Sequence, residues 1–284
     1  MAEQTERQTT KHRARKRFGQ NFLVDETIID SIVDLVEEQM SGATGKTNAL
    51  IEIGPGLGAI TQPLLKRFNS LTAIEIDRDL AARLRNRFAA HPGFSLIETD
   101  ALTVNLEALG SDQPGQQFTI VGNLPYNIST PLLFHLFTQA DRIESMLFML
   151  QKEVVQRMVA QPGTKTFGKL SVMTQYHCHV ESLLEIGPES FDPPPKIDSQ
   201  LIRLVPRREA LLSPPAAEQL RQIVTAAFAQ RRKTLRNTLA GICDQELIIA
   251  AGCDPGARAE RLTLQQFLQL ATRVTERLSS TAEA

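Results

Sequence analysis

The segment VGNLPYNIST, residues 121–130, places an asparagine, a proline and an aromatic residue side by side where a predicted strand ends. Oxygen acceptors aimed at the protons of a planar amine favour its attack on an electrophile through preorganised electrostatics. The Asn123 side-chain oxygen is one such acceptor and the Leu124 carbonyl is a second, while Pro125 fixes the backbone. Tyr126 offers a ring for base stacking, worth roughly 1–3 kcal/mol per contact. The segment therefore favours methyl transfer to an adenine amine over an ordinary asparagine–proline turn.

A glycine-rich turn, GPGLGA at residues 54–59, follows an apolar run and precedes a predicted helix. Glycines such as Gly54 let a ligand approach the backbone at a helix N-terminus. Glu75 follows about 20 residues later, where a carboxylate accepts the ribose hydroxyls of a nucleoside cofactor. The alternative is a tight strand-to-helix turn with a solvated Glu75. These residues predict a nucleoside cofactor but do not distinguish NAD from S-adenosylmethionine.

Asp100 helps to separate the two cofactors. It ends the apolar run FSLIETD, where a carboxylate can accept hydrogen bonds from the exocyclic amine of an adenine. It also suits the N-cap of a helix expected over 101–109, and the two roles are compatible. Asp100 and Asn123 together favour S-adenosylmethionine.

Apolar runs alternate with amphipathic helical patterns along the first part of the chain, which predicts an α/β fold with a parallel, doubly wound sheet. The expected strands are ALIEIG, LTAIEID, FSLIETD, FTIVGN and IESMLFML, and helices are expected over 25–39 (with Asp25 as N-cap), 59–68, 78–88, 130–139 and 152–160. Ligands of such sheets bind beyond the carboxyl ends of the strands. The candidate residues all fall there: Gly54, Glu75, Asp100 and Asn123.

The pattern changes after residue 206, where a proline-marked linker precedes short helical patterns only. We expect a basic flexible arm over residues 1–17, a catalytic domain over 18–206 and a small all-helical domain over 207–284. The basic segments 7–17 and 226–240 contain no acid, although the net charge of the chain is −1. Two such clusters favour a polyanionic partner over solvated surface charge.

The second cluster, QRRKTLRNTL, places Arg232 and Arg236 four residues apart on a predicted helix, so that they share one face. Arg231 and Lys233 flank that face, and two leucines supply an apolar side to anchor it. This helix is the predicted RNA-binding surface.

The bulk properties narrow the class of protein. No apolar run reaches the ~18 residues that span a bilayer, and the N-terminus is polar, so we expect neither a membrane protein nor a secreted one. The three cysteines form no CxxC pair, which fits a reduced cytoplasmic location. His177 and His179 would share a face of a strand, but no further ligand accompanies them and no metal site is expected.

Six motifs resemble those of the ribosomal RNA adenine dimethyltransferases: FGQNFL, EIGPGLGAIT, IEID, GNLPYNIST, FDPPPKIDS and QRRKTLRNTL. The similarity extends from about Lys16 to about Leu278 and is greatest to bacterial members that act on the small ribosomal subunit. It implies a Rossmann-like, seven-stranded methyltransferase sheet with a small all-helical C-terminal domain. It also implies dimethylation of two adjacent adenosines in the 3′-terminal hairpin loop of 16S rRNA, within an immature small subunit.

The resemblance assigns roles to individual residues. It implies that the following contact S-adenosylmethionine: Asn21, Leu23, Gly54, Glu75, Asp100 and Asn123. Phe191 of FDPPPK resembles the aromatic residue that stacks on the target base opposite Tyr126, and FGQNFL would cover the cofactor. RNA contacts are expected from Arg231, Arg232, Lys233 and Arg236.

Two other functions are compatible with these motifs. A related rRNA methylase, from a drug-resistance or mitochondrial branch, would share the catalytic motif and differ in target. An assembly factor would act mainly by binding the immature subunit, but the presence of Asn123 and Tyr126 disfavours a purely non-catalytic role. A monomer is the default expectation.

Overall fold

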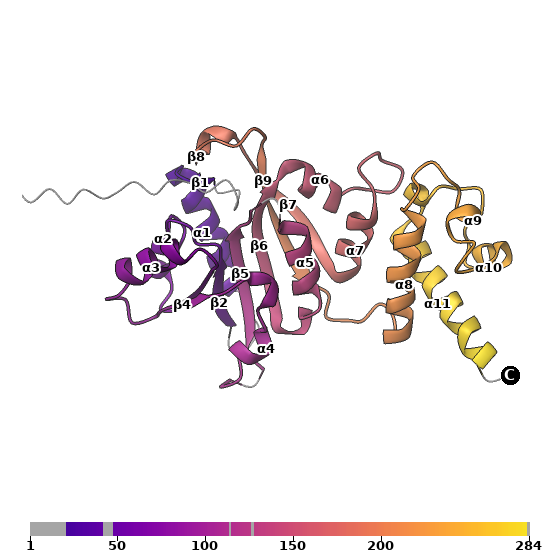
Figure 1. Ribbon diagram of the computed structural model, residues 1–284, viewed down its shortest axis with the longest axis horizontal. Helices are drawn as coiled ribbons and strands as arrows, with labels where there is room; N and C mark the ends of the chain where they lie inside the picture. The colour runs from indigo at the N-terminus through magenta and orange to yellow at the C-terminus, as the bar shows by residue number, and fades with distance from the viewer. Residues whose placement is uncertain (1–20, 42–47, 114, 126–127, 283–284) are drawn as a thin grey trace, which may run out of the picture.

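The structure is a computed structural model that describes residues 21–41, 48–113, 115–125 and 128–282. Within these ranges the chain forms a central sheet flanked by helices, with a group of helices following at the C-terminal end (Figure 1). The basic arm predicted over residues 1–17 lies outside the described residues, and so does Tyr126.

The main sheet of the described chain has seven strands in the order β4-β3-β2-β5-β6-β9-β7. They are β2 (Asn48–Ile53), β3 (Leu71–Glu75), β4 (Phe94–Glu98), β5 (Gln117–Asn123), β6 (Ile143–Gln151), β7 (Cys178–Ile186) and β9 (Ser199–Pro206). Strands β2 to β6 pair in parallel, which confirms the prediction from the five apolar runs. Strand β9 is antiparallel to both β6 and β7, so the complete sheet is mixed.

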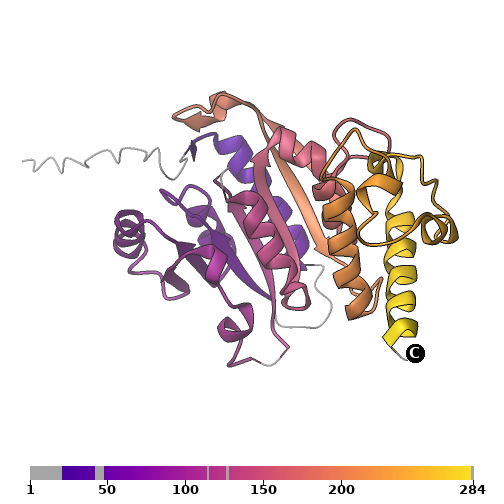
Figure 2. The same ribbon diagram turned by 45° about the vertical axis from the view of Figure 1, so that its right-hand side comes forward.

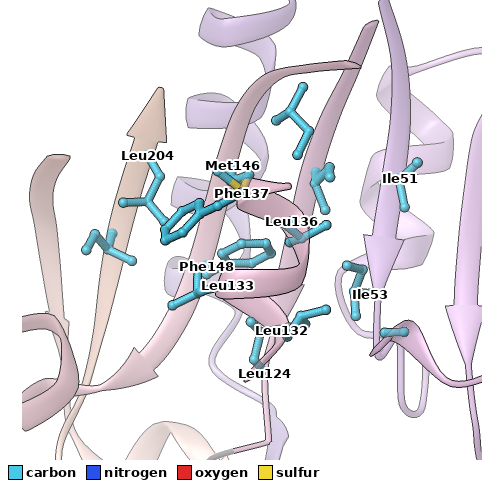
Figure 3. Packing of buried hydrophobic residues seen from close by; sticks show 14 of the residues in the cluster. Ile51, Ile53, Leu124, Leu132, Leu133, Leu136, Phe137, Met146, Phe148 and Leu204 are labelled. Atoms are coloured by element: carbon cyan, nitrogen blue, oxygen red, sulfur yellow. The ribbon is translucent and has the colours of Figure 1, made fainter. Parts of the chain in front are cut away.

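The apolar runs are continuous because both faces of the sheet are covered by helices. One face packs against α1 (Glu26–Ser41) and α2 (Thr61–Arg67). The other packs against α4 (Leu106–Leu109), α5 (Ser129–Phe137) and α6 (Lys152–Met158), and Figure 3 shows part of this core. Neighbouring residues of β6 point to opposite faces, so that Leu147 lies in the first core and Phe148 in the second.

Local sequence signals set where several helices begin. Asp25 Oδ1 accepts the N–H groups of Thr27 at 3.0 Å and Ile28 at 3.3 Å, which confirms Asp25 as the N-cap of α1. Helix α3 (Arg78–Arg87) begins in the same way, because Asp77 accepts the N–H of Asp79. These caps fix the helices that follow β1 and β3.

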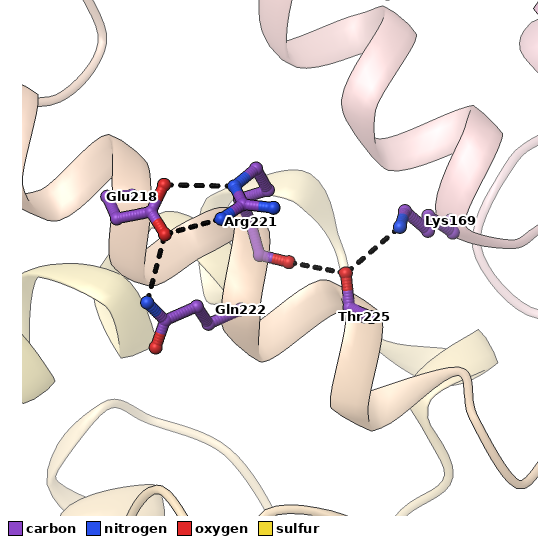
Figure 4. A network of polar contacts seen from close by, with 5 residues as sticks. All are labelled: Lys169, Glu218, Arg221, Gln222 and Thr225. Carbon is purple, nitrogen blue, oxygen red and sulfur yellow. Dashed lines mark hydrogen bonds and ion pairs between the residues drawn. The ribbon is translucent and has the colours of Figure 1, made fainter. Parts of the chain in front are cut away.

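The C-terminal helices are α8 (Pro214–Ala227), α9 (Leu235–Thr238), α10 (Gln245–Ala250) and α11 (Leu264–Ala282). They share a third apolar core, which also includes Phe167 and Met173 from the segment around α7 (Lys169–His177). Lys169 Nζ bonds Thr225 Oγ1 at 3.0 Å between α7 and α8 (Figure 4). The C-terminal helices therefore pack directly on α7, as both ribbon views show (Figures 1 and 2).

The prediction that Arg232 and Arg236 share a helix is wrong. Arg232 lies in the turn between α8 and α9, and α9 begins only at Leu235. The N–H groups of Leu235 and Arg236 bond carbonyls of the 255–257 segment, at 2.8 and 3.1 Å. These contacts satisfy the first-turn donors and start a short, separate helix.

The placement of His177 and His179 on one strand is also wrong. His177 is the last residue of α7, and its ring stacks on Phe137 with 4.8 Å between centroids. Burial lowers the pKa of His177 to about 4. His179 lies on β7, where its Nε2 is 3.2 Å from the Arg207 guanidinium. The two histidines thus serve packing and a surface contact.

Candidate active site

The carboxyl ends of β2, β3 and β5 border a cavity of about 310 Å³. Every residue that the sequence assigned to the cofactor lies in its wall: Asn21, Leu23, Gly54, Glu75, Asp100 and Asn123. They come from five separate segments of the chain. The sheet therefore brings together what the sequence distributes over about a hundred residues, as expected for parallel α/β proteins.

The glycine turn after β2 brings glycine main chain to the cavity wall. Gly54 and Gly56 have φ angles of +68° and +60°, a region that side chains other than glycine rarely adopt. The Gly54 N–H bonds the Ile74 carbonyl at 2.9 Å and so fixes the turn to β3. A Cβ atom at Gly56 would lie 3.1 Å from the Phe22 ring. The turn is thus held between β3 and the chain before α1.

Glu75 is buried at the end of β3, with 6% of its surface exposed. Its Oε1 accepts the Asp77 N–H at 2.9 Å and its Oε2 accepts the Gly56 N–H at 3.3 Å. Burial raises the pKa of Glu75, and the main-chain hydrogen bonds oppose that rise. Carboxylate oxygens have further lone pairs, so donors such as ribose hydroxyls fit this site. The residues present therefore suit a nucleoside cofactor.

Glu52 also lines the cavity, although the sequence motifs did not predict a role for it. It lies on β2, is 2% exposed, and its Oε2 accepts the Thr61 hydroxyl at 2.6 Å. Burial raises its pKa to about 7; the Thr61 hydrogen bond opposes the rise and the neighbouring Glu75 carboxylate adds to it. An acid inside the apolar run ALIEIG, two residues before the first glycine, was the available signal.

Asp100 follows β4 and lines the cavity. Its Oδ1 accepts the Leu102 N–H at 2.9 Å, so it caps a helical turn as predicted. The single helix expected over 101–109 is wrong: a short 3₁₀ turn over 101–103 is followed by α4. Asn105 interrupts the helix, because its side chain accepts the Ala108 N–H at 3.1 Å and begins α4 anew.

Asn123 is the last residue of β5, beside the glycine turn. Its side-chain Nδ2 donates to the Asn21 carbonyl at 3.1 Å. Leu124 donates its N–H to the Met149 carbonyl at 3.2 Å, and its side chain is buried in the core below. The main chain at both residues is therefore fixed where the sheet ends.

Phe191 does not line the cavity. It begins β8 (Phe191–Asp192), which pairs with β1 (Phe22–Leu23), and its register partner is Leu23. The side chain is 4% exposed and packs in the core shared with α1. Because Tyr126 lies outside the described residues, the predicted pair of stacking rings stays a prediction.

The predicted RNA-contacting residues lie in the turn between α8 and α9 and on α9, whereas the cavity is lined by residues between 21 and 128. All four are exposed: Arg231, Arg232, Lys233 and Arg236. Arg231 contacts the Lys165 carbonyl and lies 3.7 Å from a Glu260 carboxylate oxygen. The cluster is thus held beside the loop that follows α6.

Comparison with known proteins assigns this arrangement to a family. The family model for ribosomal RNA adenine dimethylase matches residues 11–276. The chain belongs to this family. Ribosomal RNA small subunit methyltransferase A of Klebsiella pneumoniae is 48% identical over 269 residues, covering 95% of this chain and 96% of the relative. The protein of the same name from Salmonella schwarzengrund is 49% identical over 265 residues, covering 93% and 94%.

Solved structures agree with the family assignment. The 23S rRNA methyltransferase ErmE superposes with a TM-score of 0.69 at 28% identity, covering 89% of this chain and 99% of that one. A dimethyladenosine transferase from Plasmodium falciparum gives the same TM-score at 23% identity, covering 88% and 95%, and supports the fold alone. The seven-stranded methyltransferase sheet with its helical C-terminal region is therefore confirmed.

As a member of the ribosomal RNA adenine dimethylase family, the chain is an enzyme that dimethylates adenine N6 in ribosomal RNA. Its methyl donor is S-adenosylmethionine, which distinguishes it from the NAD alternative. The cavity chemistry fits this donor, because a buried carboxylate and a glycine-rich turn meet at the strand ends. None of the helices in the described ranges has the length and apolar character to cross a membrane.

Proposed function

We propose that this enzyme dimethylates two adjacent adenosines in the 3′-terminal hairpin loop of 16S rRNA, within an immature small ribosomal subunit. The observation that carries the proposal is the near full-length identity of 48–49% to relatives named for the small subunit. The enzyme would act as a monomer in the cytoplasm, where a bacterium assembles its ribosomes.

We assign the cofactor to the cavity by the chemistry of its wall. The Glu75 carboxylate accepts the ribose hydroxyls, and Asp100 accepts hydrogen bonds from the adenine amine of the cofactor. Gly54 and the main chain of Asn21 and Leu23 border the rest of the molecule. Bound S-adenosylmethionine supplies an electrophilic methyl group on a sulfonium. The short side chains and buried oxygens at the strand ends leave room for it there.

We assign the target amine to Asn123 and Leu124. The amine lone pair of adenine is delocalised into the ring, so the nitrogen is a poor nucleophile. Acceptor oxygens on Asn123 and on the Leu124 carbonyl hold the amine protons and draw the nitrogen toward a tetrahedral geometry. After transfer the ammonium proton leaves to water, so no strong base is required. Tyr126 would stack on the target base, whereas Phe191, buried in the core shared with α1, could join it only after its segment moves.

We assign the C-terminal cluster Arg231, Arg232, Lys233 and Arg236 to RNA phosphates. Its exposure and its place in and after the turn between α8 and α9 support a division into a catalytic part, 18–206, and an RNA-binding part, 207–284. The shared core with Phe167 and Met173 supports a rigid connection between the two. A bound subunit would then be held in a fixed position relative to the cavity.

Primer extension across the small-subunit 3′ hairpin tests the proposal. Paired dimethyladenosines stop the polymerase, and this stop should be missing in cells that lack the gene. The wild-type gene should restore it, and Asn123→Ala should not. A stop that persists without the gene contradicts the proposal. A lost stop in 23S rRNA instead would assign the enzyme the kind of target that the name of ErmE describes.

A further inference from the structure

A hydrogen bond fixes which edge of the Asn123 amide faces the main chain of Asn21. The Asn123 side chain lies 3.1 Å from the main-chain carbonyl of Asn21. A carbonyl oxygen only accepts hydrogen bonds, so the atom of the amide that faces it must be the NH₂ nitrogen. The amide oxygen, on the other edge of the same planar group, is then directed away from Asn21. This is the oxygen that the proposed chemistry requires as acceptor.

The carbonyl of Asn21 is itself held in place by the 21–25 segment. Phe22 and Leu23 form β1 and pair with β8. The Val24 N–H bonds the Ser190 carbonyl at 2.9 Å, and the Ser190 hydroxyl donates to Asp25 Oδ2 at 3.1 Å. Three kinds of contact thus anchor residues 22–25 to residues 190–192, where FDPPPK begins.

The same segment also contacts the cofactor side of the cavity. Phe22 lies against the glycine turn, where an added Cβ at Gly56 would be 3.1 Å from its ring. Asn21, Phe22 and Leu23 all line the cavity. One short stretch of chain therefore contacts both the glycine turn and the side chain of Asn123.

We propose that the main-chain carbonyl of Asn21 is a positioning group that selects the catalytically useful orientation of the Asn123 amide. The inference rests on the proposed role of Asn123 as acceptor for the target amine. Rotating the amide by half a turn would exchange its oxygen and nitrogen and present hydrogen-bond donors to an amine that needs acceptors. The 21–25 segment prevents this rotation and links correct orientation to a chain segment that borders the cofactor.

An ester placed between residues 21 and 22 tests the proposal in the full-length enzyme. Phenyllactic acid in place of Phe22, introduced by nonsense suppression, keeps the benzyl side chain and makes the Asn21 carbonyl a weaker acceptor. The control is hydroxyisovaleric acid in place of Val24, which removes the 2.9 Å bond to Ser190 and leaves the Asn21 carbonyl an amide carbonyl. Both esters remove one N–H from the same segment.

We expect the ester at 22 to lower the single-turnover rate by about 2- to 12-fold relative to the control. This range corresponds to the net free energy that one hydrogen bond contributes. The dissociation constant for S-adenosylmethionine, by calorimetry, and the melting temperature should match those of the control. Equal single-turnover rates for the two esters would overturn the proposal. So would an effect of the ester at 22 confined to cofactor affinity, because that describes a structural role.

Two variants separate this proposal from the proposed role of Asn123. Near-normal methyl transfer by Asn123→Ala would contradict the proposed acceptor role of Asn123. If Asn123→Ala loses most activity but the ester at 22 has no effect, only the positioning role of the Asn21 carbonyl is contradicted. Asn123→Asp has two equivalent oxygens and no edge to select. The ester at 22 should therefore not lower the residual rate of Asn123→Asp, and a further loss there would also contradict the proposal.

Discussion

Gly56 donates its main-chain N–H to Glu75 Oε2 across 3.3 Å, which joins the glycine turn after β2 to the end of β3. The turn conformation and the position of the carboxylate are therefore coupled. Glu75 is buried, and the main-chain N–H groups of Gly56 and Asp77 hold its carboxylate in place. A cofactor that adds two hydroxyl donors would complete an arrangement that already exists.

Replacing Glu75 by alanine should weaken S-adenosylmethionine binding by roughly 1–3 kcal/mol, because buried hydroxyls lose a charged acceptor. Calorimetric titration measures the change. Glu98→Ala is the matched control, because Glu98 is the register partner of Glu75 on β4 but contacts Arg85 instead of the cavity. Equal loss of affinity in both variants would show that the carboxylate of Glu75 has no special role.

Gly56→Ala tests the contact between the turn and Phe22. Gly56 and Gly115 both have positive φ, at +60° and +81°, so alanine at either position should cost ~1 kcal/mol of stability. An added Cβ at Gly56 meets the Phe22 ring at 3.1 Å, whereas nothing lies within 4 Å at Gly115. We expect only Gly56→Ala to weaken cofactor binding as well, by about tenfold or ~1.4 kcal/mol in the same titration. Similar affinities for the two variants would contradict a packed turn.

Glu52→Gln should change how stability depends on pH. Burial raises the pKa of Glu52 from 4.5 to about 7, so the folded protein binds this proton more tightly than the unfolded chain. The wild type therefore loses stability from this group as pH rises from about 4.5 to about 7, and glutamine does not. Across that interval the free energy of unfolding of the glutamine variant should rise relative to that of the wild type by on the order of 3 kcal/mol, since one pKa unit corresponds to ~1.4 kcal/mol.

Urea denaturation at pH 5 and pH 8 measures this difference. The exposed linker residue Glu209 supplies the control, because Glu209→Gln should follow the wild type at both values. A constant gap between Glu52→Gln and the wild type would mean that Glu52 titrates as it does in the unfolded chain.

The sequence predicted what depends on local pattern. Strands with two buried faces have continuous apolar runs in their sequence, as β6 does from Met146 to Leu150. Asp25 precedes an amphipathic run and caps it. The positions of Gly54, Glu75 and Asn123 after successive strands were enough to place them at one edge of a parallel sheet.

What the sequence did not predict depends on contacts between distant residues. The bond between Asn21 and Asn123 joins residues 102 positions apart. Glu52 becomes unusual only because the fold buries it beside Glu75. Helix α9 is short because its first N–H groups bond the 255–257 segment, which the periodicity of residues 226–240 does not reveal.

Because α9 begins only at Leu235, the expected RNA contact involves a turn and a short helix and not one helix face. Arg232 and Arg236 are both exposed, one in the turn and one on the helix. Neither has an ion-pair partner among the residues that the structure describes. Arg221, on α8 among the same C-terminal helices, is different, because the Glu218 carboxylate accepts hydrogen bonds from its Nε and Nη2 at 2.9 and 2.6 Å (Figure 4).

Arg232→Ala combined with Arg236→Ala should therefore weaken binding to immature small subunits and flatten its salt dependence. Each lost phosphate contact should reduce the slope of log affinity against log salt by ~0.7 to 0.9. Arg221→Ala should leave the slope unchanged, because Glu218 already neutralises that guanidinium. Filter binding over a salt series measures the slopes, and cofactor affinity should stay constant because the cavity lies in the other part of the molecule. Unchanged slopes in a folded double variant would assign α9 to structure and transfer the main RNA contact to another basic segment.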